Sequence, residues 1–331
     1  MQPVMCGVWG VGAWGEKHAR VYHAIDEATL VGVYDHHPGR GAEVAARHGC
    51  RAFETPDALL EACEAVSVAV PTVAHREAVE RVVAARRHVL VEKPMAPTVA
   101  DADAMIEAAR AAGVRLQVGQ VERFNPALLA ARPYVRGPKF IECHRLALFQ
   151  PRSLDIDVVF DLMIHDLDAV LDVVGASPSS ISAVGVAVLS ENEDIANARL
   201  EFPDGCVANL TASRVSQERL RRIRFFTGDR YVSVDLFEKT GEMLHADVAR
   251  LRAARVNPLA ALGAITRGRL EIEAGEPLTL ELQAFVRSLR GEGTGAASGE
   301  AGRAALAVAE EVRAAMKRRA QQWSSLANAA S

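Results

Sequence analysis

Short apolar runs alternate with helix-like segments over the first 119 residues of the chain. The intervening segments, such as residues 74–85 and 100–112, are rich in alanine and other good helix formers, and Gly113 ends the second. This alternation predicts an α/β fold, in which a doubly wound parallel sheet carries helices on both faces. The six runs are Val4–Trp9, Thr29–Tyr34, Arg51–Phe53, Ala65–Val70, His88–Val91 and Val114–Val118.

The second half of the chain has longer apolar runs, and Pro203-Asp204-Gly205 joins two of them as in a hairpin. A periodic segment, residues 158–174, interrupts them and stops at Gly175, which predicts a helix. We expect a mostly antiparallel open sheet with one face on helices and the other meeting a second subunit. The β runs are Lys139–Leu148, Ile181–Leu189, Ile195–Phe202, Cys206–Ser213, Leu220–Phe226 and Arg230–Asp235.

The length and composition fit two domains with full cores. The chain has 331 residues, of which half are hydrophobic and 24% charged, and its net charge is −4. We predict a dinucleotide-binding domain over residues 1–120 and a substrate-binding and oligomerisation domain over residues 121–331, which ends in a helix at about residues 300–322. Residues 238–276 show no clear pattern, and we assign them no function.

The charge and the cysteines exclude several classes of protein. A weak negative charge gives no overall attraction to nucleic acid or an anionic membrane. The five cysteines form no C-x-x-C pair, so neither a disulfide framework nor a metal site is indicated. No apolar run approaches the roughly 20 residues that span a bilayer. We therefore expect a cytoplasmic protein with reduced cysteines that binds neither nucleic acid nor membrane.

A glycine-rich turn, Gly10-Val11-Gly12-Ala13-Trp14-Gly15, follows the first predicted strand and leads into a helix. Gly10 allows the tight turn, Gly12 lets the backbone approach phosphates, and Gly15 lets the helix and the strand pack closely. Backbone amides and the helix dipole then face an anion. The strand, turn and helix together predict a site for the pyrophosphate of a dinucleotide.

Asp35 ends the second predicted strand, twenty positions after the last glycine of that turn. An acidic side chain there accepts hydrogen bonds from the adenosine ribose and repels a 2′-phosphate, so we expect NAD rather than NADP. His36, His37 and Arg40 lie just beyond and can soften this preference. The alternative is that Asp35 is only a turn residue before Pro38-Gly39.

Two further strand ends complete the predicted cofactor site. Val70-Pro71-Thr72 can support the part of the cofactor between adenosine and nicotinamide, with His75 one turn into the next helix. Thr72 as a helix cap is a compatible alternative. The candidate cofactor-binding residues are Gly10, Gly12, Ala13, Trp14, Asp35, Pro71, Thr72, His75, Glu92 and Lys93.

Lys93 follows the fifth run, at the carboxyl edge of the predicted sheet, where ligands of open α/β folds bind. There it can stabilise a developing alkoxide, although alone it would read as a solvated loop lysine. Asp161 and His165 are four apart on the predicted helix, so they stack on one face. A neutral imidazole can accept the proton of a substrate hydroxyl, although an amphipathic helix with a core-edge histidine is the alternative. Together the three residues favour catalysis.

Candidate substrate contacts lie past the sixth run. Arg123 and Asn125 can contact a phosphorylated or acylated sugar, although structural pairing of Arg123 with a carboxylate is an equal alternative. Arg152, before the predicted helix, and Arg214, after a strand, are further candidates for a diphosphate clamp. The candidate substrate-binding residues are Lys93, Arg123, Asn125, Arg152 and His165.

The chain resembles the Gfo/Idh/MocA family, named after glucose-fructose oxidoreductase, inositol dehydrogenase and a rhizopine catabolism protein. The motifs GVWGVGAWG, VAVPT, VEKP, VGQVERFNP and DLMIHDLD occur in the expected order over nearly the whole length. The resemblance implies an N-terminal Rossmann domain, a C-terminal α/β domain whose open sheet serves oligomerisation, and oxidation of one hydroxyl of a sugar or cyclitol. It also implies a catalytic group of Lys93, Asp161 and His165. Leu162-Met163 stand where many relatives have glycine, so the shape of the pocket can differ.

Three segments of the chain give a finer resemblance within the family. ERFNPA, DVVFDLMIHDLDAVLDVVG and DIANARLEFPDGCVANLTASR are similar to enzymes that oxidise nucleotide-linked N-acetylglucosamine at C3. This implies UDP-N-acetylglucosamine as the substrate, a homodimer or tetramer, and coupling to an aminotransferase that makes a 3-amino sugar for lipid A or surface glycans. Alternatives are a dehydrogenase of a free sugar or cyclitol such as myo-inositol, and a non-catalytic NAD-responsive regulator.

Overall fold

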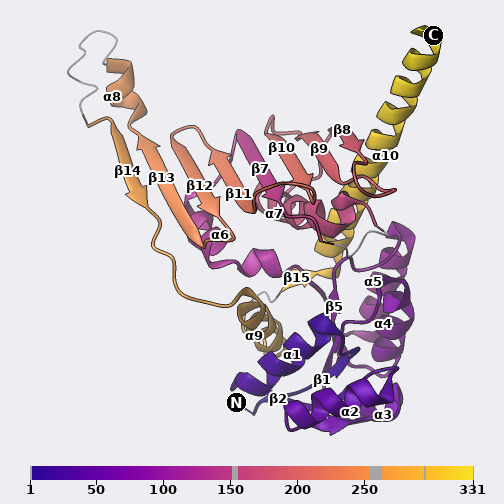
Figure 1. Cartoon of the computed structure of the whole chain (residues 1–331). Coiled ribbons are helices and arrows are strands. Elements are labelled where there is room, and N and C mark those ends of the chain that lie inside the picture. Colours follow the sequence, from indigo (N-terminus) through magenta and orange to yellow (C-terminus); the bar gives the residue numbers. More distant parts are fainter. Residues whose placement is uncertain (1, 151–155, 254–262, 294–295, 331) are drawn as a thin grey trace. The chain divides into compact units, whose positions relative to one another are not determined.

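The computed structural model describes residues 2–150, 156–253, 263–293 and 296–330, with only the backbone of residues 324 and 326–330. The chain forms two compact units, whose elements are labelled in Figure 1. Unit 1 contains the chain up to Phe124 and the segment Gly275–Leu306, and unit 2 contains Asn125–Ala274 and the chain from Ala307 onward. The units thus differ from the predicted division at residue 120, because a later segment returns to unit 1.

Unit 1 contains the predicted parallel sheet. Its six parallel strands have the order β6-β5-β4-β1-β2-β3, and the two-residue strand β15 (Ala297–Ser298) pairs antiparallel with β6. Each strand lies within two residues of its predicted position, which confirms the doubly wound α/β fold. The strands are β1 (Val4–Trp9), β2 (Ala28–Tyr34), β3 (Arg51–Ala52), β4 (Ala65–Val68), β5 (His88–Glu92) and β6 (Leu116–Gly119).

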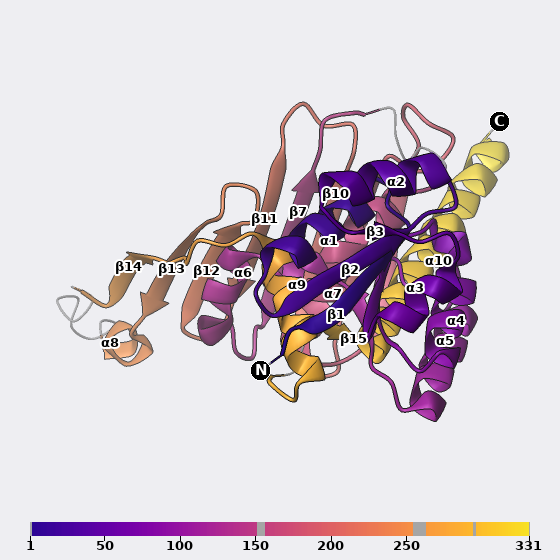
Figure 2. The ribbon, with the colours of Figure 1, turned by 90° about the horizontal axis from the view of Figure 1, so that it is seen from below.

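Helices cover both faces of this sheet, as Figure 2 shows for α1 and α9 on one side. On that side Val8, Val44 and Phe285 belong to one buried cluster, contributed by β1, α2 and α9. On the other side Gly7 makes room for Leu59 of α3, which lies 2.8 Å from where a Cβ would stand. The helices are α1 (Ala13–Ala24), α2 (Pro38–Arg47), α3 (Pro56–Ala62), α4 (His75–Ala84), α5 (Val99–Ala112) and α9 (Pro277–Leu289), with short turns η1 (Thr72–Ala74) and η2 (Val121–Phe124).

Unit 2 contains an open sheet with the order β14-β13-β12-β11-β7-β10-β9-β8. Among the strands of unit 2 that the structure describes, only β7 and β10 pair in parallel, so the predicted mostly antiparallel sheet is confirmed. Strands β13 and β14 lie in the segment for which the sequence shows no clear pattern. The pattern is missing because most of their side chains are partly or fully exposed. The strands are β7 (Phe140–Leu146), β8 (Ser180–Val186), β9 (Ile195–Glu201), β10 (Val207–Ser213), β11 (Leu220–Phe226), β12 (Arg230–Asp235), β13 (Thr240–Ala246) and β14 (Ile265–Arg269).

The helical elements within residues 126–174 pack on one face of the unit 2 sheet, where β9 buries Ala198 and Leu200. The prediction of one regular helix over 158–174 is wrong in its first part. Residues 159–163 form a π-helical turn, and a regular α-helix follows from residue 164. The helical elements are α6 (Pro126–Ala131), η3 (Arg132–Tyr134), the π turn η4 (Val159–Met163), α7 (Ile164–Val174), α8 (Val248–Ala253) and α10 (Gly299–Ala330), which begins in unit 1. None of the helices in the described ranges combines the length and apolarity that a membrane crossing requires.

Candidate active site

The turn after β1 has the backbone that its glycines predict. Gly10 adopts a φ of 84°, and its N–H donates to the carbonyl oxygen of Tyr34 at 2.8 Å. A Cβ at Gly15 would lie 1.8 Å from the carbonyl oxygen of Gly10, so only glycine lets α1 pass so close to the turn. A Cβ at Gly12, the N-cap of α1, would meet nothing within 4 Å. Gly10 and Gly15 therefore shape the turn, whereas Gly12 leaves open space before the helix N-terminus.

Asp35 directly follows β2, and two backbone amides hold its carboxylate. Its Oδ2 accepts a hydrogen bond from the N–H of Val11 at 2.7 Å, and its Oδ1 accepts one from the N–H of His37 at 2.9 Å. An ionised carboxylate has four acceptor positions, so it can also accept ribose hydroxyls. Arg40 donates hydrogen bonds to the carbonyl oxygen of Val11 at 2.8 Å and to the carboxylate of Glu16 at 2.5 Å. Because Glu16 already neutralises its charge, Arg40 offsets the charge of Asp35 less.

These groups line a cavity of about 720 Å³ within unit 1. Cavities of this size suit cofactors. The open space at Gly12 and the N-terminus of α1 fit a pyrophosphate, and Asp35 fits the adjoining ribose. The residues present therefore fit NAD. Predicted cofactor residues on the cavity wall are Gly10, Gly12, Ala13, Trp14, Asp35 and Pro71.

His75 and Thr72 occupy positions next to this wall. His75 is 1% exposed, and its ring nitrogens lie 2.9 Å from the carbonyl oxygen of Val70 and 3.0 Å from that of Pro94. Burial lowers the pKa of His75, and a neutral ring donates a hydrogen bond to only one of these two carbonyl oxygens. Thr72 does not cap α4, because the N-cap is Ala74. Contact of either residue with the cofactor stays a prediction.

Lys93 directly follows β5 and is half-buried at the carboxyl edge of the sheet. The preceding carboxylate, Glu92, lies 2.8 Å from Nε2 of His18 and accepts a hydrogen bond from the N–H of Lys93 at 3.2 Å. Burial acts to raise the pKa of Glu92, but His18 and the charge of Lys93 outweigh it and lower that pKa. Glu92 is therefore an ionised neighbour of Lys93, and its predicted contact with the cofactor stays a prediction.

In unit 2, Asp161 lies in the π turn η4 and His165 in the first turn of α7. Asp157 starts this element, because its Oδ1 accepts hydrogen bonds from the N–H groups of Val159 at 3.0 Å and Phe160 at 3.2 Å. The π turn is wider than an α turn and replaces the regular stacking that the spacing of Asp161 and His165 predicts. Both side chains are half-buried. Such π turns are frequent at functional sites.

Asp166, which follows His165 in the chain, points into the core of unit 2. It forms a buried two-bond ion pair with Arg145 on β7, with both N···O distances at 2.8 Å. This paired geometry suits guanidinium and carboxylate groups, and it fixes α7 against the sheet. Asp168, two residues further along α7, is only 2% exposed.

Arginines line a cavity of about 200 Å³ within unit 2, and Asp161 lies on the same wall. Arg145 reaches it from β7, and Arg221 stands directly opposite Arg145 in the ladder between β7 and β11. Arg219 precedes β11, and its guanidinium lies 5.1 Å from the ring centre of Phe237. The cavity thus places several cationic side chains beside the candidate carboxylate.

Arg214 also lines this cavity, but it is buried and held by other groups. Its Nε lies 2.8 Å from Asp194, and its Nη1 donates to the carbonyl oxygen of Ile156 at 2.8 Å. Burial acts to raise the pKa of Asp194, but the N–H of Leu189 and the guanidinium of Arg214 hold it well below its usual range. Arg214 therefore supports the wall of the cavity.

No motif in the sequence indicates Arg219 or Arg221, although the chain carries a signal for them. Side chains alternate between the two faces of a strand. Arg219 and Arg221 therefore share a face with Ile223, which is 1% exposed and packs into the core. Arg222 and Arg224 fall on the opposite face. The four arginines within residues 219–224 thus divide between the two faces of the strand and have different surroundings.

The remaining predicted substrate residues are Asn125, Arg123 and Arg152. Asn125 is the N-cap of α6, where its Oδ1 accepts the N–H of Ala127 at 3.1 Å and its Nδ2 donates to the carbonyl of Leu236 at 2.9 Å. It is 3% exposed, so it supports the local fold. Arg123 is half-buried in η2 of unit 1. Arg152 lies outside the described residues.

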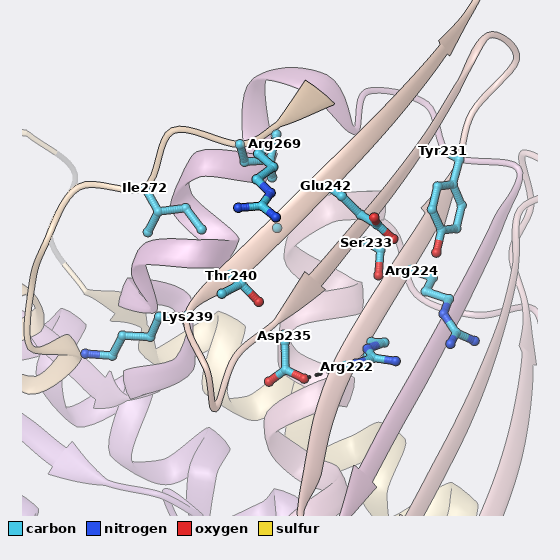
Figure 3. A pocket seen from close by; sticks show the side chains of 12 residues that line it. Arg222, Arg224, Tyr231, Ser233, Asp235, Lys239, Thr240, Glu242, Arg269 and Ile272 are labelled. Carbon is cyan, nitrogen blue, oxygen red and sulfur yellow. Dashed lines mark hydrogen bonds and ion pairs between the residues drawn. The ribbon is translucent and has the colours of Figure 1, made fainter. Parts of the chain in front are cut away.

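A separate hollow of about 670 Å³ lies on the uncovered face of the unit 2 sheet (Figure 3). Arg222 of β11 pairs there with Asp235 of β12 at 3.4 Å, and Tyr231, Ser233 and Glu242 come from neighbouring strands. The hollow is open and strongly polar. Across the described parts of the chain, no three His, Cys, Asp or Glu side chains are arranged to hold a metal ion.

Family models match both units. Residues 4–120 match the model described as "Oxidoreductase family, NAD-binding Rossmann fold", and residues 145–230 match the "GFO/IDH/MocA C-terminal domain". UDP-N-acetylglucosamine 3-dehydrogenase of Acidithiobacillus ferrooxidans is 40% identical over 312 residues, which cover 94% of this chain and 96% of that enzyme. Myo-inositol 2-dehydrogenase of Thermotoga maritima is 29% identical over 226 residues, 63% of this chain and 68% of that enzyme.

The solved structures agree with these sequence matches. A structure of the Acidithiobacillus ferrooxidans UDP-N-acetylglucosamine 3-dehydrogenase has a TM-score of 0.87 and 38% sequence identity, covering 96% of this chain and 99% of that one. Both the nucleotide-binding turn and the second sheet are thus matched by one relative over nearly its whole length. The chain therefore belongs to the Gfo/Idh/MocA family of NAD-binding oxidoreductases.

Proposed function

We propose that this chain oxidises the C3 hydroxyl of UDP-N-acetylglucosamine to a ketone and uses NAD as the oxidant. The observation that carries the proposal is the arginine-lined cavity of unit 2 beside Asp161, which suits a substrate with a diphosphate. The 40% identity to the Acidithiobacillus enzyme, spread over both units, supports it.

The charges around this cavity favour a nucleotide sugar over a free sugar. Arg145 and Arg214 are each paired with a buried carboxylate, so they build the wall. Arg219 and Arg221 add positive charge on the same side of β11, and guanidinium groups bind phosphate oxygens through paired hydrogen bonds. We assign these two arginines to the diphosphate.

We assign the chemistry to Lys93, Asp161 and His165. In this mechanism His165 accepts the proton of the C3 hydroxyl, because a neutral imidazole titrates near the working pH. Lys93 donates a hydrogen bond to the same oxygen and stabilises its developing negative charge. Asp161 orients the imidazole. The redox chemistry belongs to bound NAD, which supplies the hydride acceptor.

The other candidate contacts have supporting roles in this proposal. Arg123 contacts the acetyl or phosphate part of the substrate, and Arg152 contributes to the diphosphate clamp. Asn125 acts through the backbone that it holds at the start of α6. An aminotransferase that converts the 3-ketone to an amine is the reaction partner that the product chemistry suggests.

A substrate panel tests this function. The protein is incubated with NAD and hydroxylamine, which traps a ketone as an oxime, and with UDP-N-acetylglucosamine, N-acetylglucosamine or myo-inositol. We expect oxime only from the nucleotide sugar. Oxime from myo-inositol at a higher kcat/KM would favour the alternative, a cyclitol dehydrogenase, which the Thermotoga relative supports.

The two faces of β11 provide a matched pair of variants for the diphosphate site. Arg221→Gln raises the KM for the nucleotide sugar about 10–150-fold, since it removes one charge-assisted contact of roughly 1.5–3 kcal/mol. Arg222→Gln, on the opposite face of the same strand, leaves KM within about twofold. Equal KM values in the two variants would contradict our placement of the diphosphate.

We also propose that the uncovered face of the unit 2 sheet joins two copies of the chain. Its side chains are largely polar and half-buried, and pairs such as Arg224 with Glu142 at 2.7 Å hold them in place across strands. Light scattering should give the mass of a dimer or tetramer. A monomer at micromolar concentration would contradict this assembly.

A further inference from the structure

A chain of buried hydrogen bonds runs through the core of unit 1 to the residue before Lys93. Nε2 of His18 on α1 lies 2.8 Å from Oε1 of Glu92, and its Nδ1 lies 3.0 Å from Oγ of Ser67 on β4. Oγ of Ser67 lies 2.8 Å from the hydroxyl of Tyr22. His18, Ser67 and Tyr22 are all 0% exposed, so no solvent shares these bonds.

The ionised carboxylate fixes the direction of the first of these bonds. Glu92 is ionised, as its lowered pKa requires, so it only accepts hydrogen bonds and Nε2 of His18 must donate. In a neutral imidazole Nδ1 then accepts, and the hydroxyl of Ser67 donates to it. With this tautomer, the oxygen of Ser67 is left to accept the hydroxyl of Tyr22. All four side chains are satisfied by one arrangement, which ends on the carboxylate.

The surroundings of Glu92 fit this arrangement closely. Its Oε2 accepts the N–H of Lys93 at 3.2 Å, while Oε1 faces His18. A Cβ at Gly119 on β6 would lie 2.9 Å from Oε1, so glycine leaves the space that the carboxylate occupies. One oxygen is thus bound to α1 and the other to the backbone of the candidate catalytic lysine.

We propose that His18 is a positioning residue for Lys93. It orients the Glu92 carboxylate so that this carboxylate fixes the backbone of Lys93 and keeps a negative charge beside the ammonium group. The inference rests on the proposed function, since it gives Lys93 a catalytic role. It goes beyond that function because it assigns the positioning of the lysine to a residue of α1, the helix that follows the glycine turn.

This role has a physical consequence for Lys93. An opposite charge close to an ionisable group favours its charged form and shifts its pKa by about 1–3 units. The oriented carboxylate should therefore raise the pKa of Lys93 and keep it protonated at the pH of the reaction. If His18 no longer donates, Glu92 loses its buried partner and its fixed position, and the pKa of Lys93 falls.

Two substitutions of His18 separate this role from simple packing. The side-chain amide of His18→Gln reaches the place of Nε2 and can still donate to Glu92. The amide of His18→Asn reaches only the place of Nδ1 and faces Ser67. Ser67→Ala, which breaks the chain, is matched by Ser288→Ala, which removes a fully buried hydroxyl elsewhere in unit 1.

The readout is the pKa of Lys93, measured by competitive labelling with acetic anhydride across a pH series and mass spectrometry of the lysine peptides. The chain has four other lysines, Lys17, Lys139, Lys239 and Lys317, which serve as internal controls. No sugar substrate is needed, so the result stands even if the wild type fails to oxidise UDP-N-acetylglucosamine and the proposed function is wrong.

We expect the pKa of Lys93 to fall by about one unit in His18→Asn, and by less than about 0.3 units in His18→Gln. Ser67→Ala should lower it slightly and Ser288→Ala should not change it. The kcat of His18→Asn should fall about tenfold while its Kd for NAD stays within twofold. Equal Lys93 pKa values in the Asn and Gln variants would overturn the proposal.

Should either His18 variant fail to fold, Glu92→Gln provides a second test. It keeps the shape of the side chain and an acceptor for His18, but it removes the negative charge. The proposal requires the pKa of Lys93 to fall in this variant as well. An unchanged Lys93 pKa in folded Glu92→Gln would show that the carboxylate does not act on the lysine.

Discussion

Unit 1 and unit 2 build their cavities from different parts of the polypeptide. The cavity of unit 1 is shaped mainly by backbone, through the left-handed Gly10, the close contact at Gly15 and the helix start at Gly12. The cavity of unit 2 is shaped by charged side chains, which are held by buried partners such as Asp166 and Asp194. A cavity shaped by backbone suits a cofactor that many enzymes share, and a cavity shaped by side chains suits one particular substrate.

The largest expected effect comes from removing a proposed catalytic group from either unit. His165→Ala or Lys93→Met should lower kcat about 10²–10⁴-fold, the usual contribution of a general acid or base. The Kd for NAD should stay within a few-fold, because neither side chain shapes the glycine turn. Calorimetric titration with NAD and steady-state rates measure the two quantities. A parallel loss of NAD affinity and rate would argue against these roles.

Asp194→Asn tests how far unit 2 depends on its buried charge pairs. It leaves the guanidinium of Arg214 buried without its counter-charge, which should lower the free energy of unfolding by about 3–5 kcal/mol at pH 7. Asp172→Asn, at the more exposed pair with Arg132, should cost less than about 1 kcal/mol. Urea titrations give both values.

The effect of Asp194→Asn should depend on pH in a definite direction. The pKa of Asp194 is lower in the folded than in the unfolded protein. Its contribution to stability is therefore complete above the unfolded value, near pH 4, and declines as the pH falls toward the folded value. The gap between wild type and variant should narrow below about pH 4. A gap that widens in acid would contradict this account.

Two glycine substitutions in unit 1 separate the folding of the glycine turn from the access of the cofactor phosphates to it. Gly12→Ala should change the free energy of unfolding by about 1 kcal/mol or less, yet raise the Kd for NAD about 10–100-fold, since its methyl enters the space for the phosphates. Gly15→Ala should destabilise the fold itself, because its Cβ would overlap the carbonyl of Gly10. Unchanged NAD affinity in Gly12→Ala would mean that the pyrophosphate lies elsewhere.

The smallest expected effect concerns the choice of cofactor. Asp35→Asn keeps the size of the side chain but removes the charge that repels a 2′-phosphate, so the preference for NAD over NADP should fall about tenfold. The ratio of the two Kd values measures this. Wild-type protein that binds both cofactors equally would show that Asp35 does not set the preference.

The sequence predicts unit 1 better than unit 2 for a physical reason. Only glycine tolerates the backbone conformation at Gly10 and the close contact at Gly15, so the glycines of the sequence by themselves indicate this turn. By contrast, the roles of Arg219 and Arg214 in unit 2 depend on partners elsewhere in the sequence, which are Phe237 and Asp194. Their roles become visible only after the chain has folded.

Missed secondary structure has a related cause. Strand β14 is exposed along its length, so it lacks the alternation that marks a half-buried strand. The sequence predicts regular helix where the π turn holds Asp161, because one wide turn hardly changes the apolar spacing. Helix α9 follows the segment without a pattern, and its packing in unit 1 depends on contacts with residues more than 200 positions away.

The most direct test of the central claim follows one deuterium atom. UDP-N-acetylglucosamine deuterated at C3 is incubated with the protein, NAD and hydroxylamine, and the nicotinamide product is analysed by mass spectrometry. We predict that the deuterium moves to the reduced cofactor and that the oxime forms at C3 of the sugar. Retention of the deuterium in the sugar, by protein that binds NAD, would contradict oxidation at C3.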